Sequence, residues 1–238
     1  MTLNRDNIKS GLVQEIVREA ERLGLLKALT PEERLKSRQD TLKDVRPGSD
    51  VWVFGYGSLM WNPAFHFAEQ QPALCYGYHR RFCLSTPVGR GTPDCPGLML
   101  GLDRGGSCAG IAFRIAGDMV EEELDVVWQR EMVAGSYIPT WVRLRTDRGR
   151  VPAIAFVINR QTERYAGGLT MEQTARQIAE ARGRLGACAE YLTNTVAALD
   201  QLGIADGPMH DLMERVLALQ GCKNYSRIEE WRQECLKK

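Results

Sequence analysis

The sequence predicts an α+β fold, in which a mixed six-stranded barrel is surrounded by peripheral helices. Between residues 51 and 160 lie short segments rich in β-branched and aromatic residues, separated by turns that contain Gly, Pro or Asp. We expect six strands there, at 51–57, 72–85, 97–103, 108–115, 136–146 and 151–159. Helical periodicity precedes and follows these segments and occurs once between them. Because strands and helices do not alternate regularly, a barrel is favoured over a doubly wound sheet.

The N-terminal part of the chain is predicted to be helical. Apolar residues recur at helical spacing over residues 6–28, which indicates an amphipathic helix that packs on another part of the protein. Thr30 and Pro31, followed by Glu33, have the pattern of a capping box with a proline at the first helical position. This second helix is expected to end near residue 45, and the turn at 46–49 closes a helical extension over residues 1–48.

A second helical region follows the predicted strands. Thr170 and Gln173 form another capping-box pattern, and apolar residues at helical spacing continue to about residue 200. Residues 49–205 are therefore interpreted as the core domain. Residues 206–238 are interpreted as a charged helical tail that packs on it.

Composition limits the possible partners. The 238 residues are enough for one domain with an extension, and 31 basic against 30 acidic residues give a net charge of +1. This balance gives no support for a nucleic-acid partner, so we expect a small-molecule ligand. The longest apolar stretch, 151–158, is far shorter than the roughly 18 residues that span a membrane, and the first residues contain no apolar signal segment. No membrane association and a cytoplasmic location are expected.

Cysteine and histidine usage gives no indication of a metal centre. The seven cysteines include no CxxC pair, which is typical of reduced thiols rather than of a disulfide framework or a zinc site. The three histidines, His66, His79 and His210, are widely separated. The sequence therefore predicts no bound metal.

The first predicted strand runs directly into a glycine-rich turn, Gly55-Tyr56-Gly57-Ser58. Backbone N–H groups presented at the end of a strand suit a small anionic group, although such glycines also occur in ordinary tight turns. A serine nucleophile at Ser58 is not supported. The turn lacks the second glycine of a GxSxG motif, and no histidine is an evident partner.

The helix expected between the strands carries a carboxylate on its apolar face. Asp118 and Glu121 are expected to cap this helix, and its apolar stripe ends at Glu131 after Leu124, Val127 and Trp128. Burial would raise the pKa of this carboxyl group and make it a proton acceptor near neutral pH. The alternative is an exposed Glu131 paired with one of three arginines, Arg114, Arg130 or Arg143. The acids at 121–123 are favoured in the first turn by the helix dipole alone.

Taken together, several motifs make the chain similar to the ChaC family of γ-glutamylcyclotransferases, and to its glutathione-directed branch in particular. The similarity covers about residues 51–205 and rests on the segments 53–63, 77–82, 96–97, 110–113, 130–131 with Tyr137, and 190–192. The first segment and the paired Arg80 and Arg81 are its most specific parts.

The resemblance implies a barrel with a cavity at its mouth, no metal and no organic cofactor. It also implies cleavage of glutathione to 5-oxoproline and cysteinylglycine. Glu131 matches the family's catalytic acid and base. The substrate-binding residues implied by the resemblance are Phe54, Gly55, Tyr56, Gly57, Ser58, Leu59 and Tyr191, although Tyr191 is equally compatible with a core position.

One residue departs from the family pattern. Relatives usually have an asparagine three residues before the Tyr-Leu pair, where this chain has Cys188. A thiol cannot make the hydrogen bonds of an amide, which puts any polar contact from this position to the substrate or the loop in doubt.

Some features remain open at this level. Alternation along a strand sends Arg80 and Arg81 to opposite faces, so only one can face the cavity. The Gly- and Pro-rich segment 87–96 is either a lid or an ordinary surface loop. Two other functions fit parts of the pattern: a cyclotransferase for other γ-glutamyl amines or amino acids, and a non-catalytic binding module.

Overall fold

The computed structural model describes residues 3–221. Three helices precede the first strand: α1 (Arg5–Lys9), α2 (Leu12–Arg22) and α3 (Pro31–Leu42). The central part contains β1 (Val51–Gly55), the 3-10 helix η1 (Ser58–Met60), β2 (Glu69–Thr86), β3 (Gly97–Ile115), α4 (Val120–Glu131), β4 (Tyr137–Thr146) and β5 (Gly149–Ile158). The last part contains α5 (Met171–Glu180), the short strands β6 (Arg182–Gly183) and β7 (Gly186–Ala187), α6 (Cys188–Gln201) and α7 (Gly207–Leu219).

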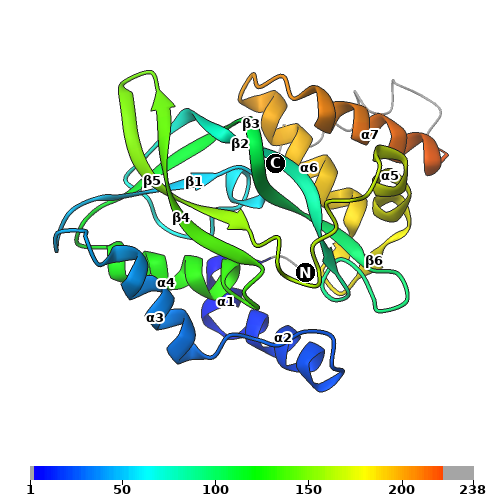
Figure 1. The fold of residues 1–238 in the computed structure, drawn as a ribbon, viewed down its shortest axis with the longest axis horizontal. Coiled ribbons are helices and arrows are strands. Elements are labelled where there is room, and N and C mark those ends of the chain that lie inside the picture. The colour runs from blue at the N-terminus through cyan, green and yellow to red at the C-terminus, as the bar shows by residue number, and fades with distance from the viewer. Residues whose placement is uncertain (1–2, 222–238) are drawn as a thin grey trace.

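The long strands close into a barrel in the order β1-β3-β2-β4-β5. Neighbours in this order are antiparallel, and the barrel closes through a parallel contact between Val53 of β1 and Ile154 of β5. The predicted α+β barrel with peripheral helices is confirmed. Figure 1 shows α1–α4 along one side of the barrel, at the bottom of the view, and α5–α7 on another side, at its right.

The predicted number of strands was wrong, because the segments 97–103 and 108–115 form one strand, β3, in the described chain. The glycines that suggested a break, Gly105 and Gly106, have φ angles of +102° and +70°, and the pairing with β2 resumes beyond them. Opposite them the register shifts between Tyr76 and Tyr78. The glycines therefore bend a continuous hairpin of two long strands instead of ending one strand.

Helix boundaries follow local backbone chemistry. The predicted helix over 6–28 is divided into α1 and α2 at Gly11, whose φ of +91° is left-handed. The Thr30–Glu33 capping box is confirmed, with both reciprocal hydrogen bonds present. The capping box expected at Asp118 was wrong, because α4 has Met119 at its N-cap and no side-chain cap there.

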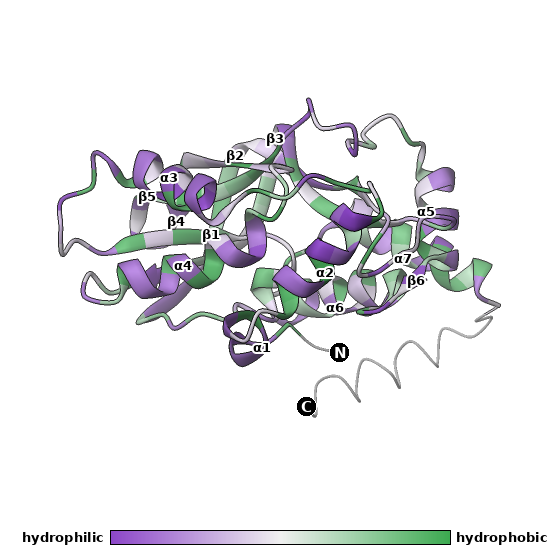
Figure 2. Ribbon diagram, turned by 90° about the horizontal axis from the view of Figure 1, so that it is seen from below, coloured by the Kyte–Doolittle hydropathy of each residue, from purple (hydrophilic) through white to green (hydrophobic). Residues whose placement is uncertain are grey.

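Amphipathic helices close the hydrophobic core against the barrel. In Figure 2, which is coloured by hydropathy, hydrophobic and hydrophilic residues alternate along α2 and α4. Trp128 of α4 packs edge-on against Phe156 of β5, with ring centroids 5.1 Å apart. Its indole Nε1 donates a 3.2 Å hydrogen bond to Ser37 Oγ, which links α4 to α3.

A buried carboxylate attaches the N-terminal helices to this core. Glu123, in the first turn of α4, is completely buried, which a position near a helix N-terminus does not predict. Its carboxylate pairs with the Arg5 guanidinium and accepts a 2.8 Å hydrogen bond from the backbone N–H of His66. The ion pair fastens α1 to α4.

The C-terminal helices α5 and α6 pack against β3 of the β2–β3 hairpin. The Thr170–Gln173 capping box is confirmed at the start of α5, but the hairpin β6–β7 interrupts the helical pattern before α6. The predicted helical tail begins as α7, and its continuation over 222–238 lies outside the described residues. The division into extension, core domain and tail remains a prediction. Within residues 3–221, no helix is both long and apolar enough to span a membrane.

Candidate active site

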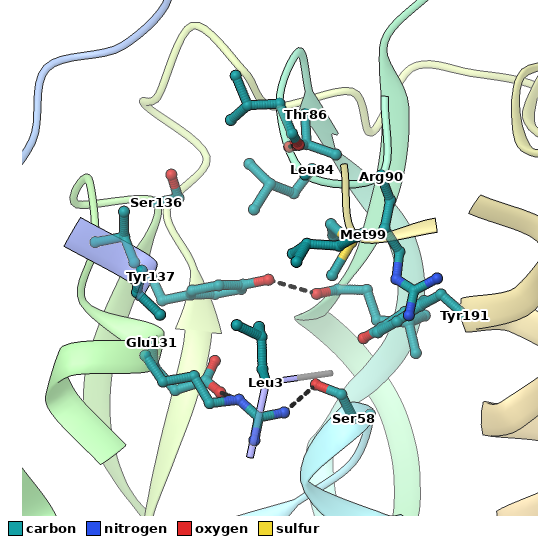
Figure 3. Close-up of a pocket in the computed structure, with 18 of the residues that line it drawn as sticks. Leu3, Ser58, Leu84, Thr86, Arg90, Met99, Glu131, Ser136, Tyr137 and Tyr191 are labelled. Atoms are coloured by element: carbon teal, nitrogen blue, oxygen red, sulfur yellow. Dashed lines mark hydrogen bonds and ion pairs between the residues drawn. The ribbon is translucent and has the colours of Figure 1, made fainter. Parts of the chain in front are cut away.

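A cavity of about 340 Å³ lies between the loop that follows β1, the end of α4 and the start of α6. Six of the predicted site residues line it: Tyr56, Gly57, Ser58, Leu59, Glu131 and Tyr191. Figure 3 shows Glu131 and Ser58 at one end of this space, with Tyr191 beside Ser58. The structure therefore brings together the glycine-rich turn, the carboxylate on α4 and the tyrosine on α6, which are far apart in the sequence.

Phe54 and Gly55 support the loop from behind and do not line the cavity. Phe54 is completely buried in β1, opposite Ala112 of β3. A Cβ atom on Gly55 would lie 2.9 Å from Phe113 Cε2 and 3.1 Å from Leu59 Cβ, so only glycine fits here. We assign both residues to the packing that fixes the loop.

Glu131 is held inside the cavity and not at its rim. Its side chain is 14% exposed, and Oε1 lies 3.2 Å from Nε of Arg130. Burial raises the pKa of the Glu131 carboxyl group, and the positive charge of Arg130 opposes this shift without cancelling it. Glu131 is thus buried, as the first interpretation predicts, and it is also paired with Arg130, one of the arginines named in the alternative.

Arg130 connects the carboxylate to the glycine-rich turn. Its Nη2 donates a 2.8 Å hydrogen bond to Ser58 Oγ, and its Nη1 donates a 2.5 Å hydrogen bond to the carbonyl of Asn62. Because Ser58 Oγ accepts from Arg130, its own hydroxyl hydrogen can be donated, and the Tyr191 hydroxyl oxygen is a hydrogen-bond partner of Ser58. Figure 3 shows the chain of contacts from Glu131 through the guanidinium to Ser58.

Three tyrosines surround Glu131, and they differ in what their hydroxyl groups bind. Tyr56 donates a 2.7 Å hydrogen bond to the carbonyl of Phe156, and Tyr137 donates one of 2.7 Å to the carbonyl of Leu100. Burial raises the pKa of Tyr191 to about 12, so its hydroxyl group is neutral. Tyr56 and Tyr137 use their hydrogens structurally, which leaves Tyr191 as the tyrosine best suited to contact a ligand.

Gly57 gives a first test of this packing. A Cβ atom at Gly57 would lie 3.0 Å from the Tyr191 hydroxyl and 3.4 Å from Leu100 Cδ1. Gly57→Ala is therefore expected to displace the tyrosine from the turn and to lower kcat/KM by about 10- to 100-fold, the typical effect of a small misplacement in a catalytic site. Gly168→Ala is the matched control, because nothing lies within 4 Å of the added atom. Full activity of Gly57→Ala in steady-state kinetics would contradict this arrangement.

Neither of the paired arginines lines the cavity. Arg80 is buried, donates to the carbonyls of Tyr56, at 2.6 Å, and of Ala109, and pairs with Asp206 at 2.7 Å. Arg81 points the other way and donates a 3.2 Å hydrogen bond to the carbonyl of Leu169. The two side chains point in opposite directions, as alternation along the strand predicts, and neither of them faces the cavity.

The segment 87–96 contributes to the cavity wall through Val88, Gly89 and Arg90. The backbone N–H of Leu185 donates a 2.7 Å hydrogen bond to the carbonyl of Gly89, and Arg90 Nη1 donates one of 2.7 Å to the carbonyl of Ala187. The segment is therefore fastened to the β6–β7 hairpin at the edge of the cavity.

Cys188 lies behind the cavity wall and contacts β3. Its Sγ lies 3.1 Å from the carbonyl oxygen of Leu98, to which the thiol donates, and 3.3 Å from the N–H of Leu98, from which it accepts. Burial raises the pKa of this thiol to about 11, so it remains a donor at neutral pH. The thiol thus forms one donor and one acceptor contact with the backbone.

Sequence reasoning did not place several other residues in the cavity. Arg90, Arg164, Ser136 and Asn194 line it, as do Leu3, Leu26 and the α2 residues Val13, Ile16 and Val17. The apolar face of α2 was evident from its periodicity, but its partner was not. Among residues 3–221, no group of three or more His, Cys, Asp or Glu side chains is arranged to hold a metal ion.

Comparisons with known proteins give consistent results. The family described as ChaC-like protein matches residues 51–219. A glutathione-specific gamma-glutamylcyclotransferase of Escherichia coli is 42% identical over 189 residues, covering 79% of this chain and 82% of that protein. Gamma-glutamylcyclotransferase 2-3 of Arabidopsis thaliana is 34% identical over 177 residues, covering 70% and 88%. A crystal structure of a glutathione-specific cyclotransferase from yeast aligns with a TM-score of 0.65 at 24% identity, covering 71% of this chain and 96% of that one, and so supports the fold.

Proposed function

The chain belongs to the ChaC-like protein family, and from this premise we propose that it is a γ-glutamylcyclotransferase that cleaves glutathione to 5-oxoproline and cysteinylglycine. The observation that carries the proposal is the buried Glu131 carboxylate, joined through Arg130 to the glycine-rich turn in one cavity. A binding module would have no need of a buried proton acceptor beside its ligand. The volume of about 340 Å³ is within the range of small-molecule sites.

In this reaction the substrate supplies its own nucleophile. The α-amine of the γ-glutamyl unit attacks its γ-carbonyl carbon, a C–N bond closes the five-membered ring, and the bond to the cysteinyl nitrogen breaks. Well-oriented intramolecular attack lowers a barrier by up to about 7–11 kcal/mol relative to a bimolecular step. We assign the folding of the glutamyl chain to the turn 56–59, whose backbone N–H groups hold the α-carboxylate.

Glu131 is proposed to move the protons. An α-amine with a reference pKa of about 8 is mostly protonated at pH 7 and must lose a proton before it attacks. The ionised Glu131 accepts that proton, and its protonated form returns one to the cysteinyl nitrogen as the C–N bond breaks. The ring nitrogen then loses a second proton, which passes to the released amine to give its ammonium form. One carboxyl group with alternating roles is sufficient, because the overall reaction consumes no water and releases no net proton.

The oxyanion of the tetrahedral intermediate needs a donor in the same region. Ser58 is proposed for this role, and its donor groups, which contact the Tyr191 hydroxyl oxygen in the structure, would turn to the oxyanion when the substrate binds. Tyr191 is the second proposed donor. Tyr56 also lines the cavity but is a weaker candidate, because its hydroxyl group already donates to the carbonyl of Phe156.

The direct test is incubation of the purified protein with reduced glutathione, followed by chromatography of the products. Equal amounts of 5-oxoproline and cysteinylglycine are expected. Glutamate as the product, or no product, would contradict the proposal. A panel of other γ-glutamyl amino acids and γ-glutamyl amines separates a glutathione enzyme from the alternative cyclotransferase, which would convert these at comparable rates.

The pH profile of kcat/KM gives a further prediction. Only ionised Glu131 accepts a proton, so activity should fall as the pH drops through its pKa. Because burial raises that pKa, the midpoint of this acid limb is expected above the ordinary value of 4.5. A limb centred at or below 4.5 in steady-state kinetics would argue against Glu131 as the group that titrates.

The cytoplasm is proposed as the location of this activity, because the cysteine spacing in the sequence favours reduced thiols over a disulfide framework.

A further inference from the structure

The arginines that line the cavity differ in whether a carboxylate balances their charge. Arg130 pairs with Glu131, and Arg90 pairs with Glu190, each at 3.2 Å. Arg164 also lines the cavity, but within the described part of the chain no carboxylate lies within 4.0 Å of its guanidinium. Its Nη2 donates to Ser136 Oγ, a neutral acceptor. Burial lowers the pKa of Arg164, which reflects the cost of removing this cation from water.

Arg164 is held firmly where it faces the cavity. Its backbone carbonyl accepts a 2.9 Å hydrogen bond from the N–H of Ser85, in β2. Next to it, Tyr165 forms a β-bridge with Leu84, and its hydroxyl group donates a 2.8 Å hydrogen bond to Asp103. These contacts fix the segment to the end of the β2–β3 hairpin, so the guanidinium is positioned before any ligand binds.

The guanidinium lies away from the catalytic carboxylate. In Figure 3, Ser136, to which Arg164 donates, is on the other side of the Tyr137 ring from Ser58 and Glu131. The cavity therefore has the glycine-rich turn and Glu131 at one end and an unpaired cation toward the other. Glutathione has a similar polarity, because its two carboxylates are at opposite ends of the peptide.

We propose that Arg164, together with Ser136, forms a subsite for the terminal carboxylate of the leaving dipeptide, and that this contact selects glutathione over γ-glutamyl compounds without that carboxylate. The proposal rests on the proposed function and assigns the recognition of its substrate. A guanidinium presents paired N–H donors that match a carboxylate, and charge-assisted hydrogen bonds of this kind are strong. Arg90 is less suited, because Glu190 already balances its charge and its guanidinium lies 5.7 Å from the centre of the Tyr191 ring.

The test compares glutathione with its C-terminal glycinamide, in which the terminal carboxylate is replaced by a neutral amide. For the wild-type protein, kcat/KM is expected to be about 10- to 100-fold higher for glutathione, as for the loss of a hydrogen bond to a charged group. In Arg164→Met this preference should disappear. The value of kcat/KM for glutathione should fall to that for the glycinamide, and kcat/KM for the glycinamide should change less than about threefold. Arg164→Lys, which keeps the charge, should recover part of the preference. Arg150→Met, an exposed arginine outside the cavity, is the control.

Two results would overturn the subsite. One is a wild-type protein that does not distinguish the two compounds, and the other is an Arg164→Met variant that loses both equally, which indicates a structural role. Titration calorimetry with the same two compounds separates this failure from failure of the proposed function. Preferential binding of glutathione without formation of 5-oxoproline would refute the chemistry and retain the subsite. Turnover of both compounds with no preference for glutathione would refute the subsite and retain the proposed chemistry.

Discussion

Replacement of Glu131 by glutamine is expected to lower kcat for glutathione cleavage by about 10²- to 10⁴-fold, the usual contribution of a general acid and base. The amide has the shape of the carboxyl group but cannot accept a proton from the α-amine or return one to the cysteinyl nitrogen. KM should change little, because the turn 56–59 and the arginines are untouched. Steady-state kinetics on the purified variant measures both constants.

The loss of activity in the Glu131→Gln variant should not result from unfolding. Because burial raises the pKa of Glu131 in the folded state, the folded protein binds this proton more tightly than the unfolded chain does. Ionisation of Glu131 therefore costs stability as the pH rises from 4.5 through the raised pKa, and the neutral amide avoids that cost. At pH 7 the variant should be at least as stable as the wild type in chemical denaturation.

The matched control is Glu121→Gln on the same helix, since the Glu121 side chain is 80% exposed. It makes the same chemical change outside the cavity and should keep kcat within about twofold, as expected for a surface substitution. If Glu131→Gln retained wild-type turnover, or if both variants lost activity together, the role of Glu131 would be refuted.

Arg80→Met is expected to lower the free energy of unfolding by about 3–5 kcal/mol, the typical cost of removing one partner from a buried ion pair. The Arg80 side chain is only 1% exposed, and methionine removes the cation paired with Asp206 and the guanidinium donors to the carbonyls of Tyr56 and Ala109. Because the Tyr56 carbonyl belongs to the glycine-rich turn, kcat/KM should fall as well. Urea denaturation and steady-state kinetics measure the two effects.

Arg81→Met is the control for this prediction. Arg81 is adjacent in β2, but among residues 3–221 its guanidinium forms one hydrogen bond, to the carbonyl of Leu169, so its loss should cost about 1 kcal/mol. Equal destabilisation by the two substitutions would show that Arg80 has no special role in fixing the turn.

The fold could be predicted from the sequence where local patterns determine it. The strand segments, the capping boxes at Thr30 and Thr170 and the apolar stripe that ends at Glu131 are all local. Apart from the capping box expected at Asp118, two errors of helix and strand continuity occurred at glycines. Gly11 separates two helices, and Gly105 lies within a continuous strand. In both cases the same φ freedom is present, and only the tertiary pairing decides whether the chain breaks or bends.

The parts of the site that are encoded in short local segments could also be predicted from the sequence. The glycine-rich turn and the inward carboxylate are recognisable from short segments, and the structure brings them into one cavity. Arg164 was not recognised, because it comes from a segment with no motif. The apolar face of α2 was predicted, but its position at the cavity was not, because long-range packing brings it there. The sequence left open which of Arg80 and Arg81 faces the cavity, because the contacts of the Arg80 guanidinium depend on where β3 and α7 pack.

The central claim, intramolecular attack assisted by Glu131, is tested most directly by the source of the product's oxygen atoms. When glutathione is converted in H₂¹⁸O, attack by the α-amine predicts 5-oxoproline that contains no ¹⁸O, together with cysteinylglycine, as measured by mass spectrometry. Glutamate that carries ¹⁸O in its γ-carboxylate would contradict the account, because it would show that water had attacked the carbonyl carbon.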